Sequence, residues 1–419
     1  MTKGTAMNKA ENFLRKYGLH EDCFNFEEHV RGFTAEMEAG LSGRESSLLM
    51  LPSYLGVEPE TPPSGEVIAV DAGGTNIRIA LVSFKPGEEP VVNRLEKHRL
   101  PGSDGEITKD EFFGRIAAYI GERTDASGDA GFCFSFPSEI GADRDGKIIH
   151  FDKEVKVKDS AGRYIGKELN DAFIAVGKAP LNVTVLNDTA AALIGGVVSQ
   201  GVSGMGGYIG MIYGTGFNVC YYDPVKKMLI NTEAGGYSGI TPSVCDAEID
   251  AESDDPGKQR LEKMVSGAYF SSVALKAIRL AAREGLFRTG TAELIGGLAG
   301  LDAVTIDAFM REDGGRGTSP GVLFSEPEDA ALLYGIFDGL YERAAKLLAI
   351  AITAVLARSG ASAAHKGYIV AEGSAFRYGF RFRERFERYI MANARGDRPY
   401  ELKLADDHVL IGAGASVFL

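Results

Sequence analysis

The chain has no tryptophan, few cysteines, no long apolar run and no excess of positive charge. Its four cysteines, Cys23, Cys133, Cys220 and Cys245, stand far apart and form no C-x-x-C pair. We therefore expect neither a zinc site nor a disulfide framework, and a reducing cytoplasm fits best. The longest apolar stretch, residues 347–356, is about half of the roughly 20 residues that a membrane helix needs. The sequence thus predicts a cytoplasmic protein with no membrane partner.

The charge balance also excludes some partners. The 45 Lys and Arg against 58 Asp and Glu give a net charge of −13, which nucleic acid and anionic lipid would repel. With 45% hydrophobic and 25% charged residues, the chain has the composition of a globular enzyme, and its 419 residues predict two or three domains. Its 53 glycines are about twice the usual share and indicate many tight turns, some of them at ligand sites.

A weak internal repeat is visible in the sequence. A strand–turn–strand pattern occurs at residues 67–82 and again at 208–222, and both turns carry Gly, Thr and Asn. About one domain length separates the two units. The repeat predicts two similar α/β domains, with a nucleotide site between their turns.

Apolar periodicity predicts further elements. We expect strands at residues 130–134 and 181–186, and helices at 108–123, 188–198, 259–284 and 328–358.

The two turns carry groups suited to phosphate. In the first, the eight-residue string 71–78 (DAGGTNIR), the glycines let backbone N–H groups point at a phosphate, while Thr75, Asn76 and Arg78 add donors and charge. Asp71 can hold a hydrated Mg²⁺. The second turn, 214–218 (GTGFN), offers similar donors. An ordinary hairpin is the alternative for each turn taken alone.

Asp188 follows the strand expected at 181–186 and begins a helix. One interpretation is a helix N-cap. The other is a general base that accepts the proton of an alcohol attacking phosphorus. Both can hold at once. No P-loop string and no protein-kinase motif set occurs in the chain.

Together these motifs resemble the hexokinase family, of the kind found in eukaryotes and some bacteria. Eight segments match its pattern in order: 70–78 (VDAGGTNIR), 131–137 (GFCFSFP), 187–189 (NDT), 210–221 (GMIYGTGFNVCY), 231–233 (NTE), 259–267 (QRLEKMVSG), 372–374 (EGS) and 412–413 (GA). The resemblance implies an α/β fold of two actin-like (ribonuclease-H-like) domains, with mixed sheets and helices on both faces, flanking a deep cleft. The small domain would comprise residues 65–198 and 405–419, and the large domain 1–64 and 199–404.

The resemblance also implies roles. Asp188 would be the general base, and Asp71 would hold Mg²⁺ through water. The sugar would be bound by Ser135, Asp152, Lys153, Asn187, Asn218, Glu233 and Glu262. ATP would be bound by Asp71, Gly73, Gly74, Thr75, Asn76, Arg78, Gly214, Thr215, Gly216, Gly373, Ser374 and Gly412.

Two departures from the family pattern bear on specificity. Asp152 stands before Lys153 where the family usually has Thr, which puts the identity of the hexose in question. Phe217 replaces a small residue of the second phosphate turn, a change that can narrow the site.

Three hypotheses follow. The first is a hexokinase that transfers the ATP γ-phosphoryl group to the 6-hydroxyl of glucose or a close relative, as a monomer or homodimer. The second is a nucleotide hydrolase on the same scaffold, in which Asp188 activates water. The third is a non-catalytic sugar sensor. Sugar-stimulated phosphoryl transfer distinguishes the first from both others.

Overall fold

The protein is described by a computed structural model. It covers residues 3–74, 76–151, 155–311, 326–362, 364–394, 399–404 and 408–419. Three of the predicted site residues, Thr75, Asp152 and Lys153, lie outside the described residues.

Two mixed β-sheets form the framework of the described chain. The strands of the larger sheet run in the order β1 (Leu51–Pro52), β13 (Met228–Asn231), β12 (Phe217–Asp223), β11 (Gly207–Tyr213), β14 (Gly367–Glu372) and β15 (Tyr400–Leu404). Those of the smaller sheet run in the order β10 (Asn182–Leu186), β6 (Asp129–Phe134), β2 (Gly65–Gly73), β3 (Asn76–Phe84) and β4 (Val91–Arg99). Two short pairs, β5 (Ile107–Thr108) with β9 (Val157–Lys158) and β7 (Ser138–Ile140) with β8 (Gly146–Ile148), accompany them.

The two sheets repeat one topology. In each, an antiparallel meander (β2–β3–β4 or β11–β12–β13) is extended by two parallel strands (β6 and β10, or β14 and β15). This confirms the internal repeat expected from residues 67–82 and 208–222. Strand β2 is buried on both faces because Ile68 and Val70 face one core and Val67 and Ala69 another. A strand in that position reads as a continuous apolar run.

Helices surround the sheets. Those of the first half are α1 (Lys3–Lys16), α2 (Phe26–Leu41), α3 (Lys109–Ile120), α4 (Ile165–Ala175) and α5 (Asp188–Gln200). Those of the second half are α6 (Val244–Glu252), α7 (Arg260–Val265), α8 (Gly267–Arg283), α9 (Thr289–Gly297), α10 (Ala303–Arg311), α12 (Pro327–Ser359), α13 (Ser374–Tyr378), α14 (Phe382–Asn393) and α15 (His408–Ala415). Short 3-10 turns lie at Glu21–Cys23, Gly121–Asp125, Ala234–Gly236 and Ser416–Phe418. None of the helices within the described ranges is both long and apolar enough to cross a membrane.

The helix expected at residues 259–284 is wrong as a single helix. Ser266 adopts an extended conformation (φ −69°, ψ 159°) and separates α7 from α8. The first N–H groups of α8 bond outside the helix, from Gly267 to the Gly214 carbonyl at 2.8 Å and from Ala268 to the Thr215 carbonyl at 3.1 Å. The break therefore supplies hydrogen-bond donors to the carbonyl groups of a turn about 50 residues earlier in the sequence. The helix expected at 328–358 is confirmed as α12.

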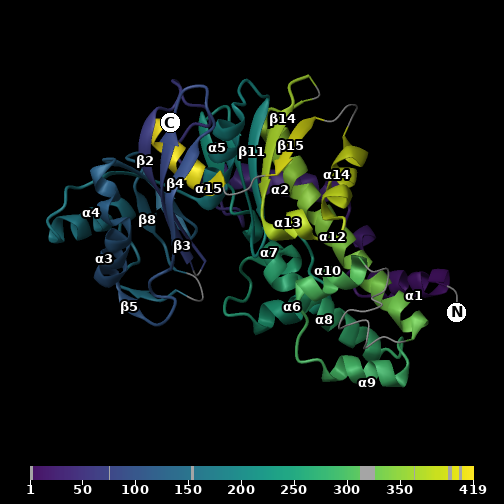
Figure 1. Ribbon diagram of the computed structural model, residues 1–419. Helices are drawn as coiled ribbons and strands as arrows, with labels where there is room; N and C mark the ends of the chain where they lie inside the picture. The colour runs from purple at the N-terminus through teal and green to yellow at the C-terminus, as the bar shows by residue number, and fades with distance from the viewer. Residues whose placement is uncertain are drawn as a thin grey trace.

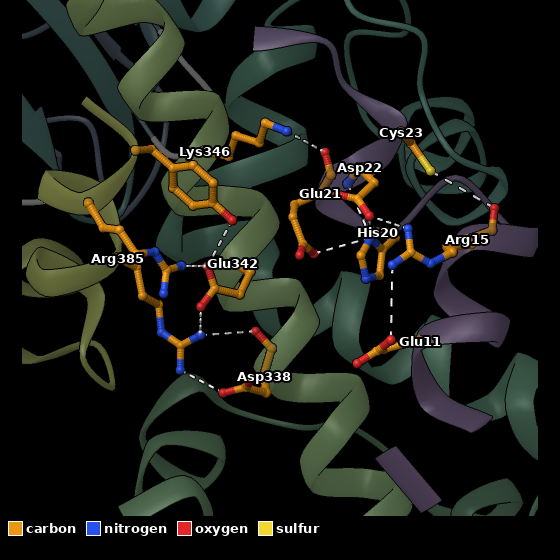
Figure 2. Close-up of polar contacts among 12 residues, drawn as sticks. Glu11, Arg15, His20, Glu21, Asp22, Cys23, Asp338, Glu342, Lys346 and Arg385 are labelled. Carbon is orange, nitrogen blue, oxygen red and sulfur yellow. Dashed lines mark hydrogen bonds and ion pairs between the residues drawn. The ribbon is translucent and has the colours of Figure 1, made fainter. Parts of the chain in front are cut away.

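Helix α12 anchors the N-terminal segment and α14 through polar contacts (Figure 2). Lys346 donates to the Glu21 carbonyl at 2.9 Å. On another part of α12, Asp338 and Glu342 accept from the Arg385 guanidinium at 2.6 and 2.5 Å. Because Arg385 is almost fully buried, this pairing with two carboxylates is needed to offset its desolvation.

The two sheets are joined by a crossing of α5 and α15. Helix α5 follows β10 of the smaller sheet but packs on β11 of the larger, whereas α15 packs on β2 and β6 of the smaller. Figure 1 shows the C-terminal helix α15 beside the early strands β2 and β4. The helices approach so closely that a Cβ atom on Gly195 would lie 2.0 Å from the His408 carbonyl oxygen, and one on Gly412 would lie 1.8 Å from that of Ala191.

The close contact of α5 and α15 predicts that even one added methyl group there destabilises the fold. Gly195→Ala should lower the free energy of unfolding by about 1–3 kcal/mol, because backbone rather than a flexible side chain would have to move. Thermal and urea unfolding would measure the loss. Gly296→Ala, in α9 with open space around it, is the matched control and should be neutral or stabilising by up to about 1 kcal/mol. Equal behaviour of the two variants would contradict this account of the crossing.

Candidate active site

Asp188 lies where β10 ends and α5 begins. The N-cap of α5 is Asn187, whose side-chain oxygen accepts the Thr189 N–H at 2.9 Å. Asp188 is the first helical residue, and its carboxylate accepts the Thr189 hydroxyl at 3.1 Å. Asn187 is thus the residue that caps α5. The Asp188 carboxyl instead interacts with Asp71 and Ser135 on the smaller sheet's side.

Burial dominates the electrostatics of Asp188. Desolvation, followed by the negative charge of Asp71, raises the pKa of Asp188 to about 6. Hydrogen bonds from Thr189 and Ser135 stabilise the charged form and oppose that shift. The result is a carboxyl that is ionised at neutral pH yet has the proton affinity of a useful base.

Asp71 is held by Arg78 across the hairpin. The two residues are directly opposite in the β2–β3 register. Arg78 donates to Asp71 Oδ2 from Nε at 2.8 Å and from its terminal nitrogen at 2.7 Å. Cys133 lies buried beside Asp71 and Asp188, and burial together with those two charges raises the pKa of its thiol well above the usual range. The thiol therefore stays neutral and serves as packing.

The first predicted phosphate turn lies against the predicted sugar strand. Ser135 donates its N–H to the Ala72 carbonyl at 3.1 Å. A Cβ atom on Gly73 would lie 2.6 Å from Ser135 Oγ, so only glycine leaves room for that hydroxyl. The structure therefore brings Asp71, Gly73, Ser135 and Asp188 together.

The second predicted phosphate turn meets the predicted adenosine motif. Gly214 lies against Gly373, where a Cβ atom on Gly214 would be 3.5 Å from the Gly373 Cα atom. Gly373 has a φ of 120°, and a Cβ atom there would lie 2.2 Å from the Tyr213 carbonyl oxygen. Glycine is thus required at 373 by conformation and by space. The start of α8 fixes the turn from its other side.

The predicted sugar-binding residues on the larger sheet's side are held by hydrogen bonds to their surroundings and, for Asn218 and Glu233, through a shared partner. Glu262 accepts the Phe217 N–H at 3.0 Å through Oε2. Asn218 donates to Asn231 at 2.9 Å, and Asn231 donates to Glu233 at 2.7 Å. Sequence reasoning missed Asn231. Its position two residues before Glu233, within the motif segment 231–233, was the available signal.

Asn187 approaches this group from the other sheet. A cavity of about 20 Å³, room for one water molecule, is lined by Asn187 together with Asn231 and Glu233. Ser138 of β7 and Ser53 line it too. Candidate sugar residues from both sheets therefore border one small cavity, whose other lining residues are apolar: Leu51, Pro52, Phe136, Ile140 and Ala190.

The expectation that Phe217 narrows the site is wrong. Its side chain is 2% exposed and belongs to the core of the larger sheet. The ring packs edge-on to Tyr213, which in turn stacks on Phe382 of α14 at 4.6 Å. Phe217 thus packs behind the turn, and its side chain does not enter the side predicted to face phosphate.

Gly412, the last of the predicted ATP residues, lies in the α5–α15 crossing. Its contacts there are with Ala191 and Gly195. A packing role accounts for the glycine, and its place beside adenosine remains a prediction.

One carboxylate–histidine group has the spacing of a metal site in the described part of the chain: His20, Glu21 and Asp22. It is satisfied by protein contacts (Figure 2). His20 Nδ1 accepts the Asp22 N–H at 3.1 Å, and Asp22 pairs with Arg15. We assign it no ligand.

The pKa of Asp188 predicts a pH-dependent cost to stability. Because the folded-state pKa of about 6 exceeds that of an unfolded Asp, about 4, folding favours the protonated form. The carboxyl thus costs up to about 3 kcal/mol at pH 7, and this cost disappears as the pH falls through 6 to 4. Asp188→Asn should therefore melt at a higher temperature than wild type at pH 7, with the difference shrinking toward pH 4.

Asp302→Asn is the matched control, because Thr305 donates two hydrogen bonds to Asp302 and lowers its pKa. That variant should be slightly destabilised at pH 7 and unchanged in acid. A destabilised Asp188→Asn at pH 7 would contradict the desolvation account.

Comparison with known proteins shows which family this chain resembles. Two family models, both described as hexokinase, match residues 9–198 and 208–419. Human hexokinase HKDC1 is 32% identical over 281 residues, which are 61% of this chain and 30% of that protein. Human hexokinase-3 is 32% identical over 260 residues, 57% of this chain and 27% of that protein. The matches thus span less than a third of these relatives.

Solved structures show the same fold. A hexokinase from Schistosoma mansoni complexed with glucose superposes with a TM-score of 0.79 at 22% identity, over 100% of both chains. Another hexokinase crystal structure gives a TM-score of 0.76 at 21% identity, covering 100% of this chain and 96% of the other. The expected α/β class with two mixed sheets and the actin-like hexokinase fold is confirmed. Since one family model alone matches half of the chain, and the two together nearly all of it, the chain belongs to the hexokinase family.

Proposed function

We propose that this protein is an ATP-dependent hexose kinase that phosphorylates the 6-hydroxyl of glucose or a close relative. The observation that carries the proposal is Asp188, a half-buried carboxyl with its pKa raised to about 6. Its neighbour in the chain, Asn187, borders the same small cavity as Asn231 and Glu233. A hexose hydroxyl must lose its proton as it attacks phosphorus, and a positioned carboxylate can accept it.

The sugar would be held by groups of both sheets. Ser135 and Asn187 would contact it from one side, and Asn218, Glu233 and Glu262 from the other. Paired amides and carboxylates fix the direction of several O–H groups at once. The placement of Asn187 and Glu233 on one small cavity supports this shared pocket.

The phosphates would lie between the two turns. Backbone N–H groups of Gly73, Gly74, Thr215 and Gly216 would face them, while the Gly214 N–H closes the turn on the Gly216 carbonyl at 3.0 Å. Arg78 would add charge, and Thr75, Thr215 and Asn76 would add neutral donors. Gly373, Ser374 and Gly412 would border the adenosine. Phosphoryl transfer needs positioning and charge stabilisation more than covalent help, so such donors suffice.

Asp71 fits a role beside Mg²⁺. Its carboxylate is a hard oxygen ligand. It lies near enough to Asp188 for the two negative charges to interact, and Arg78 offsets part of that charge through Oδ2. Asp71 would hold the ion through water, and the ion would neutralise charge on the phosphates. Cytoplasmic location, the monomeric or homodimeric state and the division into domains 65–198 with 405–419 and 1–64 with 199–404 remain predictions.

The two alternatives have less support. A nucleotide hydrolase has no use for the Asn218–Asn231–Glu233 group. Placing these polar side chains in the protein costs desolvation, and a hydrolase binds no sugar that would use them. A non-catalytic sensor has no use for a carboxyl that costs stability at neutral pH. Phosphoryl transfer to a hexose separates all three hypotheses.

The first test is ADP release from Mg-ATP with glucose, mannose, fructose, glucosamine or N-acetylglucosamine. We expect turnover with glucose or a close relative, in a 1:1 ratio of ADP to sugar phosphate. Asp188→Ala should reduce kcat by about 10²–10⁴-fold, the usual contribution of a general base. ADP release that ignores every sugar would favour the hydrolase, and sugar binding without turnover would favour the sensor.

The pH dependence gives a second test. Only the ionised Asp188 can accept a proton, so kcat/KM should be level above pH 6 and fall tenfold per unit below it. Ser135→Ala removes a hydrogen bond to the charged form and should move this limb to higher pH. A profile that is flat from pH 5 to 8 would rule out Asp188 as the titrating base.

A further inference from the structure

Three side chains of the larger sheet form a chain of hydrogen bonds whose direction is fixed at one end by a carboxylate. Asn231 Nδ2 lies 2.7 Å from Glu233 Oε1. An ionised carboxylate only accepts hydrogen bonds, so the Asn231 amide must turn its NH₂ group toward Glu233. Its oxygen then faces the other way, toward Asn218.

Backbone groups fix the direction at the other end. Asn218 Oδ1 accepts the N–H groups of Val219 at 2.7 Å and Ala234 at 3.2 Å. A backbone N–H only donates, so the NH₂ group of Asn218 must face Asn231, and the two amides meet at 2.9 Å. Asn231 Oδ1 also accepts the Glu233 N–H at 3.3 Å. One orientation of both amides satisfies all of these bonds.

This fixed direction determines what the group can offer a ligand. Both bonds of Asn218 Oδ1 are to backbone, and the second hydrogen of its Nδ2 bonds to none of the described residues. Asn218 therefore presents an N–H donor, whereas Glu233 presents carboxylate oxygens. A ligand must supply an acceptor to the first and a donor to the second, which a sugar does with two hydroxyl groups of defined direction.

We propose that Asn231 is a positioning residue that sets this donor–acceptor order of the hexose pocket. It is only 7% exposed and bonds to both Asn218 and Glu233. The assignment rests on the proposed function, in which those two residues bind the hexose. Asn231 acts through them, because one amide supplies the donor that orients Glu233 and the acceptor that orients Asn218.

Asn231→Asp tests the assignment with almost no change in shape. At pH 8 the new carboxylate cannot donate to Glu233 and repels it, so the Kd for glucose should rise about 10- to 100-fold, the loss expected for a hydrogen bond to a charged group. Two facing carboxylates readily share one proton as the pH falls. The shared O–H restores a donor toward Glu233, so the affinity of this variant should recover toward that of wild type at pH 5.

Binding should be measured by calorimetric titration with glucose in the absence of nucleotide. Turnover is a poorer readout because Asp188 titrates in the same pH range. Wild type at each pH provides the baseline. Asn231→Ala should bind weakly at every pH without recovery in acid, and it stands in if the Asp variant does not fold.

Asn170→Asp is the matched control. Asn170 makes the same kind of two-way amide contact, with the Leu181 N–H and carbonyl at 2.8 and 2.9 Å, but in the smaller sheet's packing. It should lower stability and leave the glucose Kd unchanged.

The outcomes separate the two proposals. If wild type binds glucose and Asn231→Asp binds equally well at pH 8, the positioning role is overturned while the proposed function stands. Weak binding by Asn231→Asp at every pH, matching the Ala variant, would also overturn it, since a merely structural defect has no acid recovery. Wild-type protein that binds no hexose would overturn the proposed function and this assignment together.

Discussion

The crossing of α5 and α15 is the constraint on which the rest of the structure depends. Each helix follows the last strand of one sheet and packs on the other sheet, so the two halves interlock through a single layer. The helices meet at carbonyl oxygens, with room for glycine alone at Gly195 and Gly412. Since α5 begins at Asp188, this crossing determines where the candidate base lies.

That position has an electrostatic consequence. Asp188 is close enough to the smaller sheet to interact with Asp71 and Ser135, and close enough to Cys220 of β12 to raise the pKa of that thiol, after burial. A carboxyl between two sheets loses water on both sides, and desolvation is the main reason for its raised pKa. The stability lost by burying it is what gives the carboxylate its proton affinity, so the fold accepts a local cost at the residue proposed to act.

Much of this arrangement could be predicted from sequence, and the exceptions have a common cause. The strand–turn–strand units and α12 are set by local periodicity and by glycine. The sequence therefore predicted the secondary structure of residues 67–82, 208–222 and 328–358. The break at Ser266 was not, because its reason lies in carbonyls of Gly214 and Thr215 some 50 residues away. The inward direction of Phe217 and the role of Asn231 likewise depend on partners that are brought close only by the fold. Asn187, not Asp188, caps α5, a distinction that residue type alone leaves open.

The junction of α7 and α8 connects the two kinds of candidate site on the larger sheet. Glu262 of α7 accepts the Phe217 N–H, and the first N–H groups of α8 hold Gly214 and Thr215. Lys263 secures α7 from behind, because its buried ammonium donates to Asp250, Ser253 and the Asp255 carbonyl, each at 2.8 Å. The larger sheet's share of the groups proposed for sugar and for phosphate is therefore bonded within one body, while Asp188, Ser135 and the first phosphate turn belong to the smaller sheet's side. Any relative movement of the sheets would therefore change the distance between the two halves of both proposed sites, including the distance from Glu262 to the base. For this site, reaching a reactive geometry is then a matter of bringing two preassembled parts together.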